Sequence, residues 1–193
     1  MTASDNPFAT RHLEALPFQP QGTTWDALRA RWEKLHRRAA ICGPKGSGKT
    51  TLCHELAALW KSQNHRVRTI HLSEDIRRLS GETWRKPARN EIIILDGAEQ
   101  LSPPAWLIFR WKMRNALGLL ITQHNRGRLP TLLETTTSPA LLADLAQQLA
   151  PRIDIPDNLF SKHQGNLREA LLELYDSASH RNSLNHPSRF AAS

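Results

Sequence analysis

The chain has 193 residues, of which 39% are hydrophobic and 23% charged, a balance typical of one globular domain with room for a small subdomain. The net charge of +8 permits an acidic partner such as nucleic acid, although the arginines are scattered rather than clustered. The sequence shows no apolar signal region at its start and no apolar run of transmembrane length, so we expect a cytoplasmic protein without membrane contact.

The N-terminal region combines an extended strap with one amphipathic helix. Residues 1–22 hold several prolines and isolated aromatic side chains, which predict a strap lying on the domain. A helix is predicted from Thr23 or Thr24, as its N-cap, to about Arg37. Its buried face is formed by apolar residues at helical spacing, namely Trp25, Leu28, Trp32 and Leu35.

A phosphate-binding motif follows this helix. The apolar run 39–42 predicts a buried strand, and the residues after position 50 have helical spacing. Between them, residues 43–50 match the pattern G-x-x-x-x-G-K-[ST] at every fixed position. Cys42 and Cys53 fall in these buried segments and are expected to be small core residues of a reducing compartment. The residues expected to contact a nucleotide are Gly43, Pro44, Lys45, Gly46, Ser47, Gly48, Lys49, Thr50 and Thr51.

The motif implies a specific chemistry. Its glycines let the backbone curl so that several N–H groups point at phosphate oxygens, and the following helix adds the positive end of its dipole. Lys49 is expected to contact the β- and γ-phosphates, and the Thr50 hydroxyl to ligate Mg²⁺. The sequence therefore predicts binding of a nucleoside triphosphate with Mg²⁺. The absence of a guanine-reading motif favours ATP.

The middle of the chain supplies further strands. An alternating pattern over 66–72 predicts a half-buried strand, 74–79 a short helix and 80–90 a surface loop. Residues 91–96 form the strongest strand signal, with four consecutive β-favouring apolar residues that indicate burial on both faces. This strand ends in an acid, Asp96.

The remaining elements complete an α/β pattern. They are a helix over 102–116 with Trp106, Phe109 and Met113 on one face, a strand over 118–122, a turn over 123–130, a last strand over 131–135, and helices over 138–149 and 166–175. Alternating strands and helices predict a doubly wound parallel sheet of about five strands with the fold of P-loop NTPases. We expect the strap at 1–22, the α/β core at 23–137, a helical lid of two helices at 138–176 and a disordered tail at 177–193.

Two acids are candidates for the second half of the site. Asp96 closes the strong strand, and we expect it to act as the Walker B acid that holds Mg²⁺ together with Thr50. Glu99 follows three residues later. It is either the carboxylate that orients the attacking water or a residue that starts a helix.

With these motifs in place, residues 7–176 resemble a compact AAA+ ATPase of the lineage that includes clamp loaders and replication initiators. The resemblance rests on residues 43–50, residues 92–96, the polar strand end at Thr122 and the stretch 165–168, which matches the sensor 2 pattern G-x-x-R. It implies that Arg168 contacts the γ-phosphate and closes a lid. A solvated helix arginine is the alternative for that residue.

The resemblance implies further roles. Thr122 matches the sensor 1 position, which polarises the attacking water, although a plain strand end is the alternative. Pro7 and Phe8 would lie where the family binds adenine, or would form a hydrophobic staple. Arg126 and Arg128 follow the Thr122 strand and could serve as arginine fingers for a neighbouring subunit in a nucleotide-dependent oligomer.

One departure from the family pattern leaves three functions open. Most AAA+ proteins place glutamate directly after the Walker B aspartate, but here that position is Gly97. The first reading is an ATPase acting on a protein or nucleic-acid partner, with Glu99 as the substitute. The second is a P-loop nucleotide or small-molecule kinase, and the third a non-hydrolysing switch or adaptor. A kinase lid would need arginines near the phosphates, for which the candidates are Arg77, Arg78, Arg85, Arg110 and Arg114.

One helix could also contact nucleic acid. Residues 106–114 interleave tryptophan with basic residues, which could stack on bases and neutralise phosphates. The alternative is a core helix with solvated charges.

Overall fold

The computed structural model describes residues 16–18, 20, 22–73, 81, 84–151 and 153–184, with side chains as far as residue 177. The chain divides into two compact units, and we call residues 17–136 the sheet unit and the part from 137 onward the helical unit. The helix expected over 74–79 and the pair Pro7–Phe8 lie outside the described residues. Within the described part, no helix is both long and apolar enough to cross a lipid bilayer.

The sheet unit is built on five parallel strands in the order β2-β3-β4-β1-β5. Their bounds are Arg38–Cys42 for β1, Arg66–His71 for β2, Glu91–Asp96 for β3, Gly118–Gln123 for β4 and Thr131–Glu134 for β5. Every residue of β3 and β4 is buried, which confirms the prediction from their unbroken apolar runs. The predicted fold class, a parallel α/β sheet of P-loop NTPase type, is confirmed.

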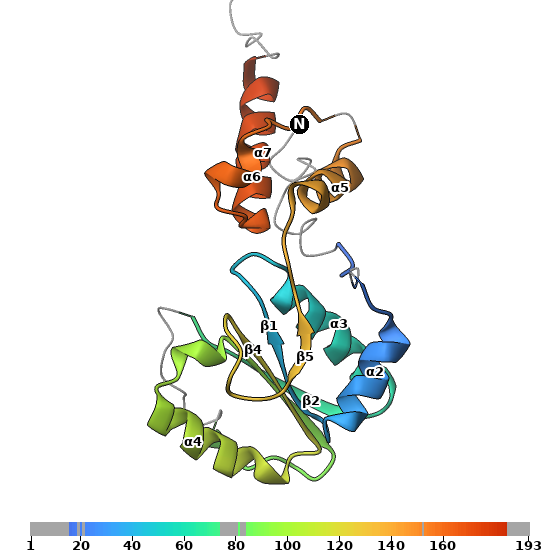
Figure 1. Ribbon diagram of the computed structural model, residues 1–193, viewed down its shortest axis with the longest axis vertical. Helices are drawn as coiled ribbons and strands as arrows, with labels where there is room; N and C mark the ends of the chain where they lie inside the picture. The colour runs from blue at the N-terminus through green and yellow to red at the C-terminus, as the bar shows by residue number, and fades with distance from the viewer. Residues whose placement is uncertain are drawn as a thin grey trace, which may run out of the picture. The chain divides into compact units, whose positions relative to one another are not determined.

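Helices cover the two faces of this sheet with separate cores (Figure 1). Helices α2 (Trp25–Lys34) and α3 (Lys49–Ser62) pack on one face, where Leu28 and Trp32 are buried as predicted. Thr24 caps α2 by accepting a hydrogen bond from the Ala27 N–H at 3.2 Å. The helix ends at Lys34 rather than near residue 37, because the next residues turn through positive φ into β1.

Helix α4 (Pro103–Lys112) packs on the other face and continues as a 3-10 turn, Met113–Asn115. Its predicted buried face is confirmed, because Trp106, Phe109 and Met113 all lie in the core against the sheet. Since Trp106 is only 6% exposed, it has no open ring face for a nucleobase, which corrects that part of the nucleic-acid interpretation.

The helical unit contains one helix more than predicted. It holds α5 (Pro139–Leu149), the short α6 (Leu159–Lys162) and α7 (Leu167–Leu184), packed around a leucine-rich core. Ser138 caps α5 as predicted, accepting from the Leu141 N–H at 3.1 Å. The expectation of disorder from residue 177 is wrong for 177–184, which continue α7. That stretch has no proline or glycine to stop a helix once it has formed.

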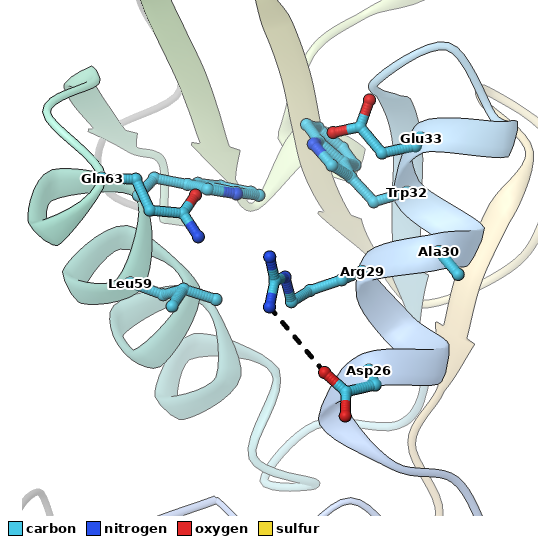
Figure 2. Close-up of a pocket in the computed structure, with 8 residues that line it drawn as sticks. Asp26, Arg29, Ala30, Trp32, Glu33, Leu59 and Gln63 are labelled. Atoms are coloured by element: carbon cyan, nitrogen blue, oxygen red, sulfur yellow. Dashed lines mark ion pairs between the residues drawn. The ribbon is translucent and has the colours of Figure 1, made fainter.

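A cavity of about 390 Å³ opens between α2 and α3 (Figure 2). Its inner wall includes Trp32 and Trp60, whose ring centroids lie 4.9 Å apart, and Arg29 and Asp26 form an ion pair at its rim. The cavity lies at the C-terminal end of α3. It is therefore separate from the loop that precedes this helix.

Candidate nucleotide-binding site

The loop of residues 43–50 joins the end of β1 to the start of α3, as the motif predicts. At Gly43 the residue after β5 approaches so closely that an added Cβ would lie 2.1 Å from the Thr135 Oγ1 atom and 2.5 Å from the Thr135 carbonyl oxygen. Only glycine fits at this position. The loop is thus shaped by its contact with the neighbouring strand end as well as by its own sequence.

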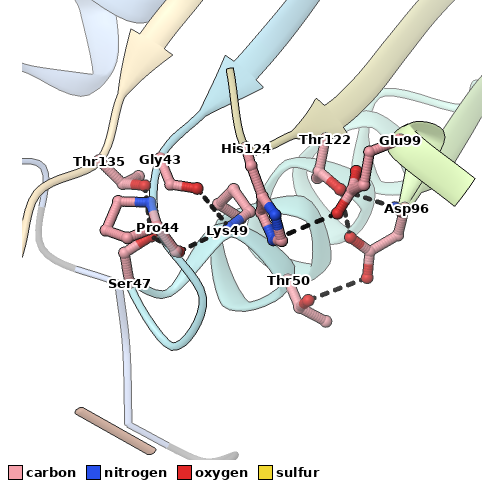
Figure 3. A network of polar contacts seen from close by, with 11 residues as sticks. Gly43, Pro44, Ser47, Lys49, Thr50, Asp96, Glu99, Thr122, His124 and Thr135 are labelled. Carbon is pink, nitrogen blue, oxygen red and sulfur yellow. Dashed lines mark hydrogen bonds and ion pairs between the residues drawn. The ribbon is translucent and has the colours of Figure 1, made fainter. Parts of the chain in front are cut away.

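Hydroxyl groups fix the loop to that strand end (Figure 3). The Ser47 hydroxyl donates to the Pro44 carbonyl at 2.8 Å and lies 2.6 Å from the Thr135 hydroxyl. The Thr135 N–H and hydroxyl both donate to the Cys42 carbonyl, at 2.7 and 3.2 Å. Ser47 and Thr135 are both buried, so these bonds form out of water. Thr135 was missed by the sequence analysis, because no local signal connects it with a loop about 90 residues earlier.

The loop keeps a set of backbone donors open. The N–H groups of residues 46–51 donate to no acceptor within the part of the chain that the structure describes. Three of them, at residues 49–51, belong to the first turn of α3, where N–H groups have no intrahelical acceptor and the helix dipole is positive. This is the donor arrangement that an anion requires.

Lys49 lies across the loop. Its ammonium group donates to the carbonyl oxygens of Gly43 and Pro44, at 2.8 and 2.7 Å. Burial lowers the pKa of Lys49, and the nearby carboxylates of Glu99 and Asp96 partly oppose that effect. The lysine therefore lies inside the site, close to both predicted acids.

Asp96 is the centre of a polar network at the carboxyl edge of the sheet (Figure 3). It accepts hydrogen bonds from the hydroxyls of Thr50, at 2.9 Å, and Thr122, at 2.6 Å. Because β4 lies between β1 and β3, its end residue Thr122 stands between the loop strand and the Asp96 strand. The sheet order thus brings together residues that are 26 to 46 positions apart.

Thr122 orients Asp96 in this structure. Its buried hydroxyl donates its one proton to Asp96 and accepts from the Gly97 N–H at 2.8 Å. Thr122→Val is expected to cost about 2 kcal/mol of unfolding free energy, because it leaves a buried acceptor and a buried donor unpaired. The variant Thr122→Ser should keep most of the wild-type unfolding free energy, because serine retains the hydroxyl group. Urea unfolding of the three proteins tests this, and a valine variant as stable as the wild type would contradict the orienting role.

The structure explains the departure at Gly97. This residue has φ +86°, and an added Cβ would lie 2.3 Å from the Leu72 carbonyl oxygen. No glutamate fits there without moving the backbone of the β2 strand end. Glu99 instead lies on a 3-10 turn, Ala98–Gln100, and its Oε1 atom is 3.3 Å from Nε2 of His124. Glu99 is therefore the carboxylate that this local backbone can offer to the site.

Two histidines were missed by the sequence analysis. Nδ1 of His71, the last residue of β2, lies 3.0 Å from Oδ2 of Asp96. His124 follows β4 and pairs with Glu99. Both come at the carboxyl end of a parallel strand, where ligand-binding side chains gather in open α/β sheets. Their position at the strand ends is the sequence signal that could have identified them.

An aromatic side chain in the strap also touches the loop. A Cβ added at Gly48 would lie 3.4 Å from two ring atoms of Phe18, so the ring packs closely on this glycine. The sequence analysis placed an aromatic contact with the nucleotide at Phe8 instead. The structure describes Phe18 and not Phe8.

The other predicted arginines lie in different settings. Arg168 is exposed in the first turn of α7, and its contact with nucleotide stays a prediction. Arg126 forms an ion pair with Glu134. Arg128 donates to the Leu101 carbonyl at 2.5 Å and lies over the Trp106 ring, and burial lowers its pKa. Arg128 is thus held by its own sheet unit rather than displayed to a neighbour, contrary to the arginine-finger interpretation.

Two of the three described kinase-lid candidates lie at the wrong edge of the sheet. Arg85 pairs with Glu91, the first residue of β3, at 2.8 Å. The carbonyl of Arg114 accepts from Arg38, the first residue of β1, at 2.8 Å. The phosphate loop and Asp96 lie at the opposite ends of these strands, roughly 15 Å away for a six-residue strand. These arginines therefore cannot close over phosphates at the loop.

Comparison with known proteins shows the fold. No protein-family model matches the sequence, and no curated protein matches it. Among solved structures, Cdc6p from Pyrobaculum aerophilum matches with TM-score 0.62 and 16% identity over 94% of this chain and 67% of its own. A variant of RuvB from Thermotoga maritima matches with TM-score 0.52 and 14% identity over 78% of this chain and 57% of its own. This chain therefore shares the P-loop NTPase fold of these two proteins, and it spans little more than half of the RuvB chain.

Proposed function

We propose that this protein binds ATP with Mg²⁺ and hydrolyses it to drive a change that acts on a partner. One observation carries the proposal: open N–H donors at residues 46–51 lie beside Lys49, and the Thr50 hydroxyl contacts Asp96 at 2.9 Å. The donors suit a polyphosphate. The adjacent hydroxyl and carboxylate oxygens suit Mg²⁺, which prefers hard oxygen ligands.

The residues take distinct parts in binding. The open N–H groups would hold the phosphate oxygens, and Lys49 would exchange its two carbonyl acceptors for the β- and γ-phosphates. Thr50 and Asp96 would hold Mg²⁺, which supplies neutralisation of phosphate charge when bound. Phe18 packs on Gly48 and is a described aromatic candidate for the base, beside the predicted pair Pro7 and Phe8. The remaining residues of the loop would contact the nucleotide through their backbone atoms.

Hydrolysis rests on Glu99. Because Gly97 leaves no room for a side chain, Glu99 would accept a proton from water, and its contact with His124 at 3.3 Å would fix its orientation. Thr122 keeps Asp96 in position, and Arg168 is the predicted γ-phosphate contact from the helical unit.

Glu99→Gln is expected to lower steady-state phosphate release by about 100-fold while leaving ATP affinity within about threefold, because the amide keeps the shape but not the basicity. His124→Asn should lower it by about tenfold, since it loosens the carboxylate without removing it. Phosphate release and equilibrium nucleotide binding are measured on the same preparations. Glu134→Gln, a surface acid paired with Arg126, is the matched control.

The same assay distinguishes the proposed ATPase from a non-hydrolysing switch and from a kinase. Unchanged turnover in Glu99→Gln would exclude Glu99 as the base. ATP binding without turnover in any protein would favour the non-hydrolysing switch, which the missing carboxylate at Gly97 supports. ADP release that depends on a small-molecule acceptor would favour a kinase, a reading weakened by the position of Arg85 and Arg114. The partner, whether protein or nucleic acid, and any nucleotide-dependent oligomer are part of the proposal.

A further inference from the structure

The outer face of α4 carries an apolar stripe with no cover among the described residues. Pro104, Leu107, Ile108 and Trp111 are exposed and recur at i, i+3, i+4 and i+7, so they line one side of the helix. Leu107, Ile108 and Trp111 are 61%, 52% and 60% exposed. No other large apolar side chain is exposed among the described residues. The stripe lies opposite the buried side formed by Trp106, Phe109 and Met113.

Three cations that have no acidic partner among the described residues border the stripe. Arg110 and Arg114 lie on one side of it and Lys112 on the other, following helical spacing. Among the described residues no carboxylate pairs with any of the three, and the sequence has no acid anywhere between Glu99 and Glu134. Arg38 donates to the carbonyls of Arg114 and Ala116, and its pKa is lowered by burial and further by Arg110. Among the described residues, this positive charge therefore has no acidic counterpart, although the Lys112 ammonium lies over the Trp84 ring, 5.0 Å from its centroid.

We propose that the α4 stripe is a docking surface for an acidic amphipathic helix of a protein partner. Apolar residues at this spacing are the anchors of helix recognition, and an exposed tryptophan is a common energetic centre of such contacts. The bordering cations favour carboxylates on the flanks of the partner's apolar face, which sets the sign of the partner's charge.

Two other occupants fit less well. A second copy of this chain would bring Arg110, Lys112 and Arg114 against their own copies, and like charges facing each other across an interface oppose association. For a nucleic acid, Leu107 and Ile108 offer no ring to stack on a base. The Arg114 guanidinium already lies over one face of Trp111, 4.3 Å from the ring centroid.

Docking on the α4 stripe does not depend on the proposed nucleotide binding, although α4 begins four residues after Glu99 and so adjoins the site. The test is therefore made without nucleotide. The probe is a labelled synthetic helix of about 20 residues with a leucine stripe at the same spacing and glutamates on both flanks. A matched peptide carries lysines in place of the glutamates. Binding to the full chain is followed by fluorescence anisotropy at low and high salt.

The acidic peptide is expected to bind at least about tenfold more tightly than the lysine peptide, and more weakly at high salt. Trp111→Ser and Leu107→Ser should each weaken binding by about tenfold, and Arg110→Glu should weaken it mainly at low salt. Lys61→Glu, an exposed charge reversal on α3 at the other face of the sheet, should leave binding unchanged. All four positions are exposed, so melting temperatures should stay near that of the wild type.

Several results would overturn the proposal. They are absence of binding, equal binding of both peptides, and binding that survives Trp111→Ser. Concentration-dependent dimerisation that Trp111→Ser abolishes would assign the stripe to a second copy. Binding of a single-stranded DNA oligonucleotide that Trp111→Ser abolishes, without peptide binding, would assign it to nucleic acid.

Discussion

Replacing Gly97 with alanine is expected to lower the unfolding free energy by about 3 kcal/mol and the melting temperature by roughly 10 °C. Two destabilising effects add, one from the backbone conformation and one from a steric clash. The residue has φ +86°, a conformation that costs an L side chain about 1 kcal/mol or more, and the new Cβ would lie 2.3 Å from the Leu72 carbonyl oxygen. The ends of β2 and β3 would have to separate. Urea unfolding followed by circular dichroism measures the effect.

Gly22 provides a matched control for this change. It has φ +68°, but nothing lies within 4 Å of a Cβ added there, so Gly22→Ala isolates the conformational cost at about 1 kcal/mol. A Gly97→Ala protein that melts within about 2 °C of Gly22→Ala would show that the close approach to Leu72 is absent. Gly97→Glu, which restores the AAA+ pattern, should be destabilised as well and should not raise turnover.

Lys49→Ala is expected to weaken ATP binding by about 100-fold, equivalent to roughly 2.8 kcal/mol, because it removes charge-assisted contacts with two phosphates. The fold should persist, since the lysine's present partners are two carbonyls that the loop can leave to water. Anisotropy of a fluorescent ATP analogue, measured with Mg²⁺ present, gives the dissociation constants.

Lys45→Ala is the paired control, because it removes the same charge from an exposed position of the same loop. We expect it to weaken binding by about threefold at most. Equal losses in the two variants would mean that the loop attracts nucleotide by overall charge. No loss in Lys49→Ala would place the nucleotide elsewhere.

Most of the fold follows from local sequence. The runs at 39–42, 91–96 and 118–122 are largely apolar, as strands buried on both faces require, and they form β1, β3 and β4. The G-x-x-x-x-G-K-[ST] pattern then fixes one strand–loop–helix connection, whereas the order of the strands in the sheet is seen only in the structure.

The elements that were missed lack such a signal. Helix α6 has four residues, of which only Leu159 is buried, too few for a periodic pattern. The extension of α7 over 177–184 is polar. Polarity alone does not separate a solvated helix from a disordered tail, since what ends a helix is a breaker or a lost cap.

The residues of the candidate site also fall into two groups, those that could be predicted from the sequence and those that could not. Lys49, Thr50 and Asp96 could be predicted because each has a motif or a strand end that fixes its place. Thr135 could not, because its role depends on which strands are neighbours, with β5 beside β1. His124 offered only its place at the end of β4 as a signal. Gly97 was recognised as a departure from a pattern, but the reason for it is a contact with Leu72 that only the folded backbone creates.

Calorimetric titration of the wild-type chain with ATP, with Mg²⁺ and again with a chelator, tests the central claim most directly. The account predicts one ATP per chain and an affinity at least about tenfold lower without Mg²⁺, because Thr50 and Asp96 would then hold no cation to neutralise the phosphate charge. A chain that is folded by circular dichroism yet binds no ATP with Mg²⁺, or binds it equally well with the chelator, would contradict the account.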